Sequence, residues 1–204
     1  MYHQRVDQAT AFGVAAFVLA GGKSTRMGKD KAFLELGGRT LLAHALDLAG
    51  TVARDVRIVG EANKFAAFGS VVEDVYHERG PLGGIHAALA STTTELNLML
   101  AVDLPFLQPE FLKYLISEAR KTGALVTVPR AGGGLQPLCA VYRRAFAEVA
   151  ERSLQEGRNK IDPLFAEVET RVLGEEDLSR AGFSEGMFRN LNTPEEWEEA
   201  KLER

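Results

Sequence analysis

The sequence predicts an α/β protein whose mostly parallel sheet carries helices on both faces. Short runs rich in β-branched and aromatic residues alternate with segments of helical periodicity, as in proteins built from βα units. The first run, residues 14–19, has no polar position, which is typical of a strand buried on both faces. A chain of 204 residues that is 46% hydrophobic can also enclose a sizeable core.

Strands and helices are expected to alternate through the first two thirds of the chain. Apolar leucine and alanine positions recur at helical spacing in residues 40–49, and Gly50 is placed to end that helix. The strands are expected at residues 14–19, 56–59, 71–72, 96–102 and 125–128, and the helices at 40–49, 62–68, 82–90 and 109–121.

The remaining third is less regular. Residues 132–134 are three glycines and predict a turn, followed by a strand at 137–141 and a helix at 145–155. Residues 156–187 mix short apolar runs with glycine and give no clear element. A short strand is expected at 187–191, and Thr193, Pro194 and Glu196 predict the capped start of a last, acidic helix.

The predicted organisation is one domain over residues 13–204, after a flexible extension at 1–12 that lacks apolar periodicity. A net charge of −4, from 24 basic and 28 acidic side chains, argues against a nucleic-acid or membrane-surface binder. The single cysteine, Cys139, excludes an internal disulfide and fits a reducing, cytoplasmic setting. Its apolar surroundings predict a buried structural thiol.

The loop after the first predicted strand indicates a polyphosphate site. Gly21, Gly22 and Gly28 allow backbone N–H groups to turn toward a ligand. The loop also carries four cations, which are Lys23, Arg26, Lys29 and Lys31. It is not a Walker A loop, because five residues separate Gly22 from Gly28 and Asp30 stands where that motif has a hydroxyl. A basic surface loop is the alternative interpretation.

Acidic and glycine residues follow other predicted strands. In open α/β sheets, ligands bind beyond the carboxyl ends of the strands, so these loops are expected to meet. Asp74 follows the third strand, and Gly83 stands in a glycine pair that opens a helix and allows close backbone approach. Asp103 stands at the tip of the apolar strand at 96–102. A Mg²⁺ ion would compensate such a carboxylate, although Asp103 and Asp74 are also ordinary cap or turn residues.

Other residues give weaker signals. Asn190 and Asn192 precede the last helix, where asparagine is often a turn residue, but the Asn192 amide oxygen is also a suitable Mg²⁺ ligand. The histidines lack metal-ligand spacing, and His44 and His86 fall on predicted helices. No Ser/His/Asp triad is indicated.

Taken together, these motifs resemble the molybdenum cofactor guanylyltransferases over residues 14–202. The resemblance is carried by four segments in order, LAGGKSTRMGKDK at 19–31, GPLGG at 80–84, DLPF at 103–106 and NLNTPE at 190–195. It implies a nucleotide-diphospho-sugar transferase-like, Rossmann-like sheet. The family's asparagine after the second strand falls near Gly60, with Asn63 three residues later, so that contact is a departure.

The resemblance implies that the terminal phosphate of molybdopterin attacks the α-phosphorus of GTP and that pyrophosphate leaves. Arg26, Lys31 and Asp103 would be the catalytic residues, and Mg²⁺ would be held by Asp103 and Asn192. The nucleotide would be bound by Leu19, Ala20, Gly21, Gly22, Lys31, Asp74, Gly83 and Asp103. Such a transfer depends on positioning and charge neutralisation more than on a protein nucleophile.

Two alternatives remain open. One is a related nucleotidyltransferase that uses CTP, or a sugar-phosphate or alcohol-phosphate acceptor. The other is a nucleotide-binding module that senses GTP without catalysis, although the presence of both Asp103 and Lys31 counts against it. Magnesium-dependent release of pyrophosphate separates an enzyme from a sensor. The base, the acceptor and the oligomeric state do not follow from the residues alone.

Overall fold

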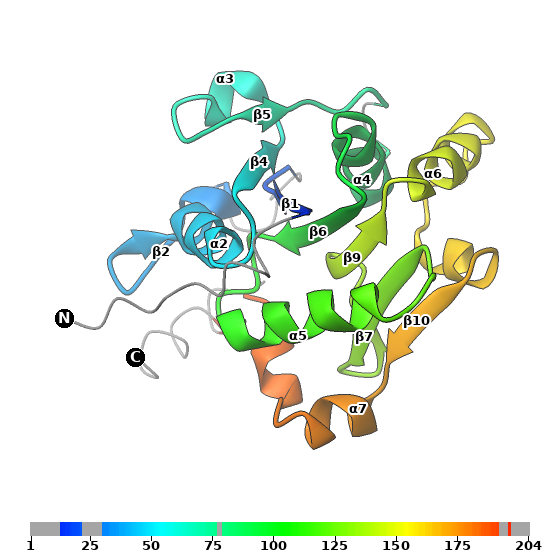
Figure 1. Ribbon diagram of the computed structural model, residues 1–204. Helices are drawn as coiled ribbons and strands as arrows, with labels where there is room; N and C mark the ends of the chain where they lie inside the picture. The colour runs from blue at the N-terminus through cyan, green and yellow to red at the C-terminus, as the bar shows by residue number, and fades with distance from the viewer. Residues whose placement is uncertain (1–12, 22–29, 77–78, 192–195, 197–204) are drawn as a thin grey trace.

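A twisted sheet runs through the computed structural model, which describes residues 13–21, 30–76, 79–191 and 196 (Figure 1). Its strands lie in the order β10-β7-β9-β6-β1-β4-β5, and β8 extends it by pairing with β7. Their bounds are Val14–Leu19 (β1), Asp55–Val59 (β4), Val71–Val72 (β5), Leu96–Ala101 (β6), Val126–Ala131 (β7), Gly134–Leu135 (β8), Cys139–Arg143 (β9) and Thr170–Leu173 (β10).

The sheet is mostly parallel, as predicted. β1 lies parallel to β4 and β6, β5 to β4, and β10 to β7. β9 pairs antiparallel with both β6 and β7, because it follows β7 through the short β8 hairpin rather than through a helical crossover. Gly132 and Gly133 turn this hairpin with φ angles of 59° and 76°, so the predicted glycine turn is confirmed.

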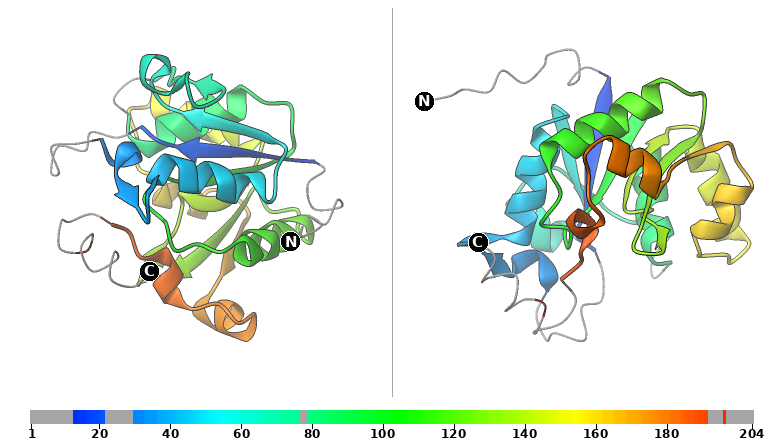
Figure 2. Two further views of the ribbon diagram at one scale, coloured as in Figure 1. Left: turned by 90° about the vertical axis from the view of Figure 1, so that its left-hand side faces the viewer. Right: turned by 90° about the horizontal axis from the view of Figure 1, so that it is seen from below.

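Helices cover both faces of the sheet (Figure 2). Along β1, Val14, Ala16 and Val18 face the core formed with α2 (Leu41–Gly50) and α5 (Pro109–Arg120). The alternate residues Ala15, Phe17 and Leu19 face α4 (Pro81–Ala90) and α6 (Phe146–Gln155). This period-two division explains why the strand has no polar position.

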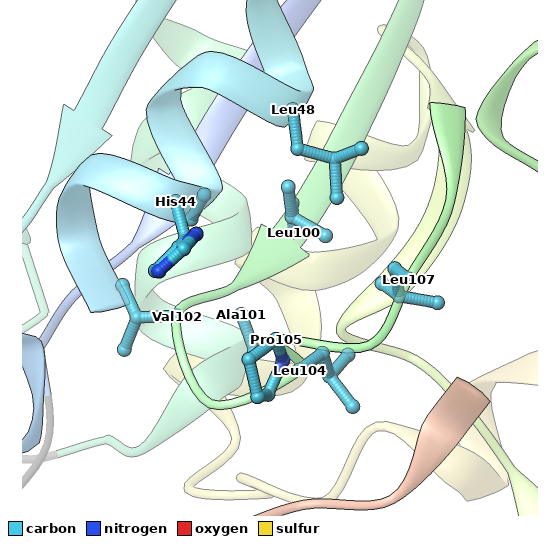
Figure 3. Close-up of a pocket in the computed structure, with 9 residues that line it drawn as sticks. His44, Leu48, Leu100, Ala101, Val102, Leu104, Pro105 and Leu107 are labelled. Atoms are coloured by element: carbon cyan, nitrogen blue, oxygen red, sulfur yellow. The ribbon is translucent and has the colours of Figure 1, made fainter. Parts of the chain in front are cut away.

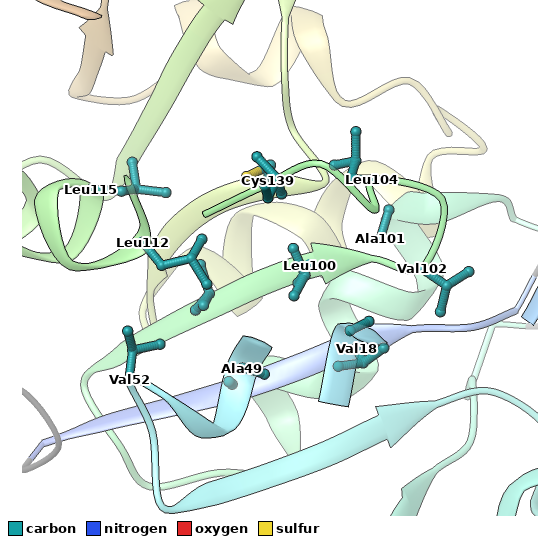
Figure 4. Packing of buried hydrophobic residues seen from close by; sticks show 14 of the residues in the cluster. Val18, Ala49, Val52, Leu100, Ala101, Val102, Leu104, Leu112, Leu115 and Cys139 are labelled. Carbon is teal, nitrogen blue, oxygen red and sulfur yellow. The ribbon is translucent and has the colours of Figure 1, made fainter. Parts of the chain in front are cut away.

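The first core packs β1, α2, β6 and α5 closely together (Figure 4). Cys139 lies in it, fully buried, and burial raises the pKa of its thiol. The predicted burial of this cysteine is confirmed.

Several predicted elements begin and end where their local chemistry requires. The Thr40 hydroxyl accepts a hydrogen bond from the Ala43 amide at 3.2 Å and caps α2, which ends at Gly50. Pro81 and Pro109 each occupy the first turn of their helix, where a missing N–H costs nothing. The expected helix at 62–68 is shorter, as α3 spans Ala62–Phe65.

The strand predicted at 187–191 is wrong. Residues Glu185–Phe188 form a 3₁₀ turn, η3, and both Met187 and Phe188 are buried. The Phe188 ring meets Phe111 of α5 edge to face, with centroids 5.1 Å apart. The apolar residues therefore pack on a helix instead of joining the sheet. The predicted last helix and the extension at 1–12 lie outside the described residues, except for Glu196.

Short elements account for the segments that the sequence left unassigned. Lys31–Phe33 forms the 3₁₀ turn η1, and Glu35–Leu36 (β2) pairs with Arg39–Thr40 (β3) in a small hairpin. Farther along, Asp162–Ala166 (η2), β10 and Glu175–Arg180 (α7) occupy the irregular region.

Candidate active site

The loops that carry the predicted site residues meet at one edge of the sheet. Strands β6, β1, β4 and β5 lie next to one another in this order, all run parallel, and all end at this edge. Beyond the ladder, the amides of Ala20 and Gly21 both donate to the Val59 carbonyl, at 3.0 and 3.2 Å, and the Gly60 amide donates to Val72 at 3.0 Å. These bonds fix the ends of the three strands beside one another.

Lys31 and Asp103 form the polar pair at this edge. The Lys31 ammonium lies 3.4 Å from the Asp103 carboxylate, and the two side chains are 20% and 24% exposed. They come from segments 72 residues apart in the chain. The predicted proximity of these residues is therefore observed. Partial burial keeps the pair accessible to a ligand while it weakens screening by water.

Local hydrogen bonds place each member of the pair. Asp30 caps η1, because its Oδ1 accepts from the Ala32 amide at 3.2 Å, and this fixes the turn that carries Lys31. Asp103 lies in the turn after β6, and its carbonyl accepts from the Leu191 amide at 3.4 Å. Asp103 is not the cap of the following helix, since Gln108 holds that position.

Asp74 lies against the first turn of α4. A Cβ atom added to Gly83 would stand 3.0 Å from the Tyr76 carbonyl and 3.6 Å from the Asp74 carboxylate. At Gly84 it would stand 3.4 Å from the Leu19 side chain and 3.5 Å from Asp74. The glycine pair therefore lets the helix N-terminus approach β1 and Asp74 closely, as its sequence predicted.

Gly60 occupies the place where the resemblance expects an asparagine. A Cβ atom on Gly60 would come within 2.8 Å of the Phe65 ring, so this ring fills the space that a larger residue would need. Asn63, three residues later, is exposed on α3. Sequence reasoning noted the departure but missed Phe65, whose position in the short α3 gave no signal.

Gly22, Arg26 and Asn192 were also predicted as site residues and lie outside the described residues. The described part of the chain contains no group of three or more His, Cys, Asp or Glu side chains that could hold a metal ion. Its helices include none that is long and apolar enough to span a membrane.

Two hollows border the loop of Asp103. One is a cavity of about 180 Å³ between α2 and the end of β6, and its lining side chains are mostly apolar (Figure 3). His44 lies at this cavity, and its Nε2 is 2.8 Å from the Leu36 carbonyl, which is a packing role. The second hollow, of about 280 Å³, has more polar side chains in its lining, which consists of Phe106, Gln108, Ser184, Gly186, Met187 and Arg189. The sequence analysis missed this second hollow.

Comparison with known proteins identifies the family to which this chain is similar. Residues 16–171 match the family model described as a MobA-like NTP transferase domain. The chain is 36% identical to the probable molybdenum cofactor guanylyltransferase of Pelotomaculum thermopropionicum over 187 residues, covering 91% of this chain and 90% of the relative. It is also 36% identical to the molybdenum cofactor guanylyltransferase of Desulfosudis oleivorans over 191 residues, covering 92% and 94%.

A solved structure of a similarly named protein has the same fold. The crystal structure of molybdopterin-guanine dinucleotide biosynthesis protein A from Archaeoglobus fulgidus superposes with a TM-score of 0.81. The two chains are 27% identical, and the match covers 92% of this chain and 97% of the other.

Proposed function

The chain belongs to the MobA-like NTP transferase domain family, and we propose that it is a molybdenum cofactor guanylyltransferase that moves GMP from GTP to the terminal phosphate of molybdopterin. The observation that carries this proposal is the Lys31–Asp103 pair at the carboxyl edge of the sheet. A cation and a carboxylate held beside glycine loops are what a phosphate-transfer site requires.

GTP is proposed to lie across the ends of β1, β4 and β5. Leu19, Ala20, Gly21 and Gly22 would offer main-chain groups, and Gly83 would allow the N-terminus of α4 to lie beside Asp74 and the ligand. Asp74 and Asp103 would border the nucleotide on either side, and Lys31 would meet its phosphates. The hydrogen bonds of Ala20 and Gly21 to Val59 support this placement, because they hold the first of these segments rigid.

The donor set at Asp103 fits Mg²⁺ bound together with a nucleotide. Mg²⁺ is usually held by one or two protein oxygens, with phosphate and water completing its octahedron. Asp103 supplies one carboxylate, and we propose the amide oxygen of Asn192 as the second ligand. When bound, the ion would neutralise and orient the phosphates.

The proposed reaction needs no covalent intermediate. An oxygen of the acceptor phosphate forms a bond to the α-phosphorus of GTP, and the bond from that phosphorus to the bridging oxygen breaks. Pyrophosphate leaves with the electron pair. Lys31 would stabilise the negative charge that grows on pyrophosphate, and we propose the same role for Arg26, five residues earlier in the chain.

The test is a panel of GTP, CTP, UTP and ATP, each with Mg²⁺, measured by thermal shift and by pyrophosphate release in the presence of molybdopterin. A ligand at a hundred times its dissociation constant adds about 2.7 kcal/mol to stability. We expect GTP to give both the largest shift and the fastest release. Equal release from CTP would favour the cytidylyl alternative, and stabilisation without any release would favour a sensor.

A further inference from the structure

The second hollow beside Asp103 is the basis of a further inference, which rests on the proposed function. We propose that this hollow, called here the Arg189 hollow, binds the phosphate monoester of the acceptor. Its six lining residues are Phe106, Gln108, Ser184, Gly186, Met187 and Arg189. This assigns the acceptor to a part of the molecule separate from the nucleotide loops.

The position of the hollow follows from the order of the strands. β1, β4 and β5 lie on one side of β6, whereas β9, β7 and β10 lie on the other. The nucleotide loops belong to the first side. The hollow belongs to the second side, because the segment around η3 packs on α5, and α5 lies against β7 and β9. Asp103, at the tip of β6, lies between them.

Two segments of the hollow are tied directly to Asp103. Phe106 follows it by three residues in the same loop. From the other side, the Leu191 amide donates to the Asp103 carbonyl at 3.4 Å, and Arg189 is two residues before Leu191. We take these two connections to bring a phosphate held in the hollow close to Asp103, on the side of β6 away from the nucleotide loops.

The lining has the chemistry of an anion site. It contains one cation, Arg189, two uncharged side chains that can donate hydrogen bonds, Gln108 and Ser184, and no carboxylate. The volume of about 280 Å³ exceeds the space of one phosphate. Phe106 and Met187 offer apolar surface to the carbon skeleton of the acceptor, so the hollow suits a phosphate monoester better than an inorganic ion.

The guanidinium of Arg189 is held in place. Its Cζ lies 4.5 Å from the centroid of the Phe106 ring, a cation–π contact. The backbone that carries it is anchored on α5, where Phe111 meets both Phe183 and Phe188 edge to face, at 5.3 and 5.1 Å. This arrangement orients the cation before the acceptor arrives, which reduces the ordering cost of binding.

The experiment measures Michaelis constants for molybdopterin and GTP separately, with Mg²⁺ present. For Arg189→Ala we expect the KM for molybdopterin to rise at least about tenfold while the KM for GTP stays within about twofold. Arg189→Lys keeps the positive charge but lacks the planar guanidinium, so its KM for molybdopterin should lie between those of the wild-type protein and Arg189→Ala. Phe106→Leu removes the ring under the guanidinium and should raise the acceptor KM less than Arg189→Ala does.

Arg180→Ala is the matched control, because this arginine is 76% exposed on α7 and pairs only loosely with Asp177, at 3.8 Å. It should change neither constant. An unchanged acceptor KM in Arg189→Ala, in an enzyme that does use molybdopterin, overturns the inference and leaves the proposed function standing.

A binding measurement keeps the inference testable without turnover. Molybdopterin retained on ultrafiltration, detected by pterin fluorescence without GTP, should fall for Arg189→Ala and not for Arg180→Ala, and equal retention by Arg189→Ala overturns the inference. If the wild-type protein transfers GMP to a different phosphate monoester and Arg189→Ala raises the KM for that compound, the proposed function fails while the inference holds.

Discussion

At the scale of single residues, the site depends on one long-range contact. Asp103 and Lys31 are placed by unrelated local features, a turn after β6 and the capped η1 turn, and their side chains meet at 3.4 Å. Neither residue contributes much to the core, since both side chains remain partly exposed. Substitutions here are therefore expected to affect chemistry more than folding.

For Asp103→Ala we expect transfer to be lost while the fold remains. The backbone carbonyl of Asp103 accepts the Leu191 hydrogen bond, so this contact survives the loss of the side chain. Losing one electrostatic contact to a transition state typically costs roughly 3 to 4 kcal/mol, a hundred- to a thousandfold in rate. Turnover and thermal unfolding should be measured together. Asp47→Ala is the control, because Asp47 pairs with Arg39 on the exposed face of α2. Normal turnover in Asp103→Ala would remove this residue from the site.

For Lys31→Ala we expect the turnover number to fall more than the affinity for GTP, because a positive charge matters most as pyrophosphate departs. The same split is expected for Arg26→Ala. Steady-state kinetics at varied GTP separate the two constants. Lys121→Ala is a suitable control, since Lys121 is 63% exposed and pairs with Glu118 at the end of α5. A raised KM with an unchanged turnover number would make Lys31 a binding residue only.

At the scale of elements, the helices and strands with strong periodicity were predictable and the short ones were not. β1, α2, α4, β6 and α5 have apolar patterns or caps that a single sequence reveals. The run at 187–191 also has apolar residues, but Met187 and Phe188 are buried against α5 rather than in the sheet. Tertiary packing determines the conformation of this segment, and no local feature of the sequence distinguishes a strand from a turn that packs on α5.

The glycine positions show the same limit of prediction from sequence, because some of their roles depend on distant contacts. Gly83 and Gly84 stand in a recognisable motif, and their role was predictable. The need for glycine at position 60 arises from Phe65, which lies on the next element and fills the Cβ position. The stacking of Phe33 on Phe65, with centroids 5.6 Å apart, then joins η1 to α3. A change at Gly60 should therefore affect the packing of three elements, the end of β4, α3 and η1.

Gly60→Ala is expected to destabilise the protein by about 1 to 3 kcal/mol, the usual cost of overpacking, because the new methyl group would stand 2.8 Å from the Phe65 ring. Urea unfolding measures this loss. Combining it with Phe65→Leu should cost less than the sum of the two single changes, since the smaller side chain vacates the space. Additive losses would show that the ring and Gly60 do not compete.

Gly50→Ala is the control for this comparison. Gly50 is the last residue of α2, nothing lies within 4 Å of its Cβ position, and its φ is not positive. We expect it to be neutral or to stabilise the protein by about 0.4 to 1 kcal/mol, through the entropy of the unfolded chain.

At the scale of the whole molecule, the sheet order divides the proposed site into a nucleotide side and an acceptor side around β6. The loops that we assign to the nucleotide could be proposed from the sequence, because they follow predicted strands and carry recognisable motifs. The acceptor side was not predictable in this way. It combines the loop after β6 with a segment about 80 residues later, whose position depends on how η3 packs on α5.

The same architecture underlies our last prediction, that GTP is preferred and that mainly backbone groups near Leu19–Gly21 and residues 80–84 read the base. Gly60 offers no side chain there, and Phe65 fills the space of one. Guanine presents both donors and acceptors, and a hydrogen-bonded site rejects an analogue that leaves its buried groups unpaired. CTP and ATP should therefore compete with GTP at least about a hundredfold more weakly, and ITP, which lacks only the exocyclic amine, should be intermediate. CTP used as fast as GTP would contradict the guanylyl assignment, while the fold and the Asp103–Lys31 pair would still describe a nucleotidyltransferase.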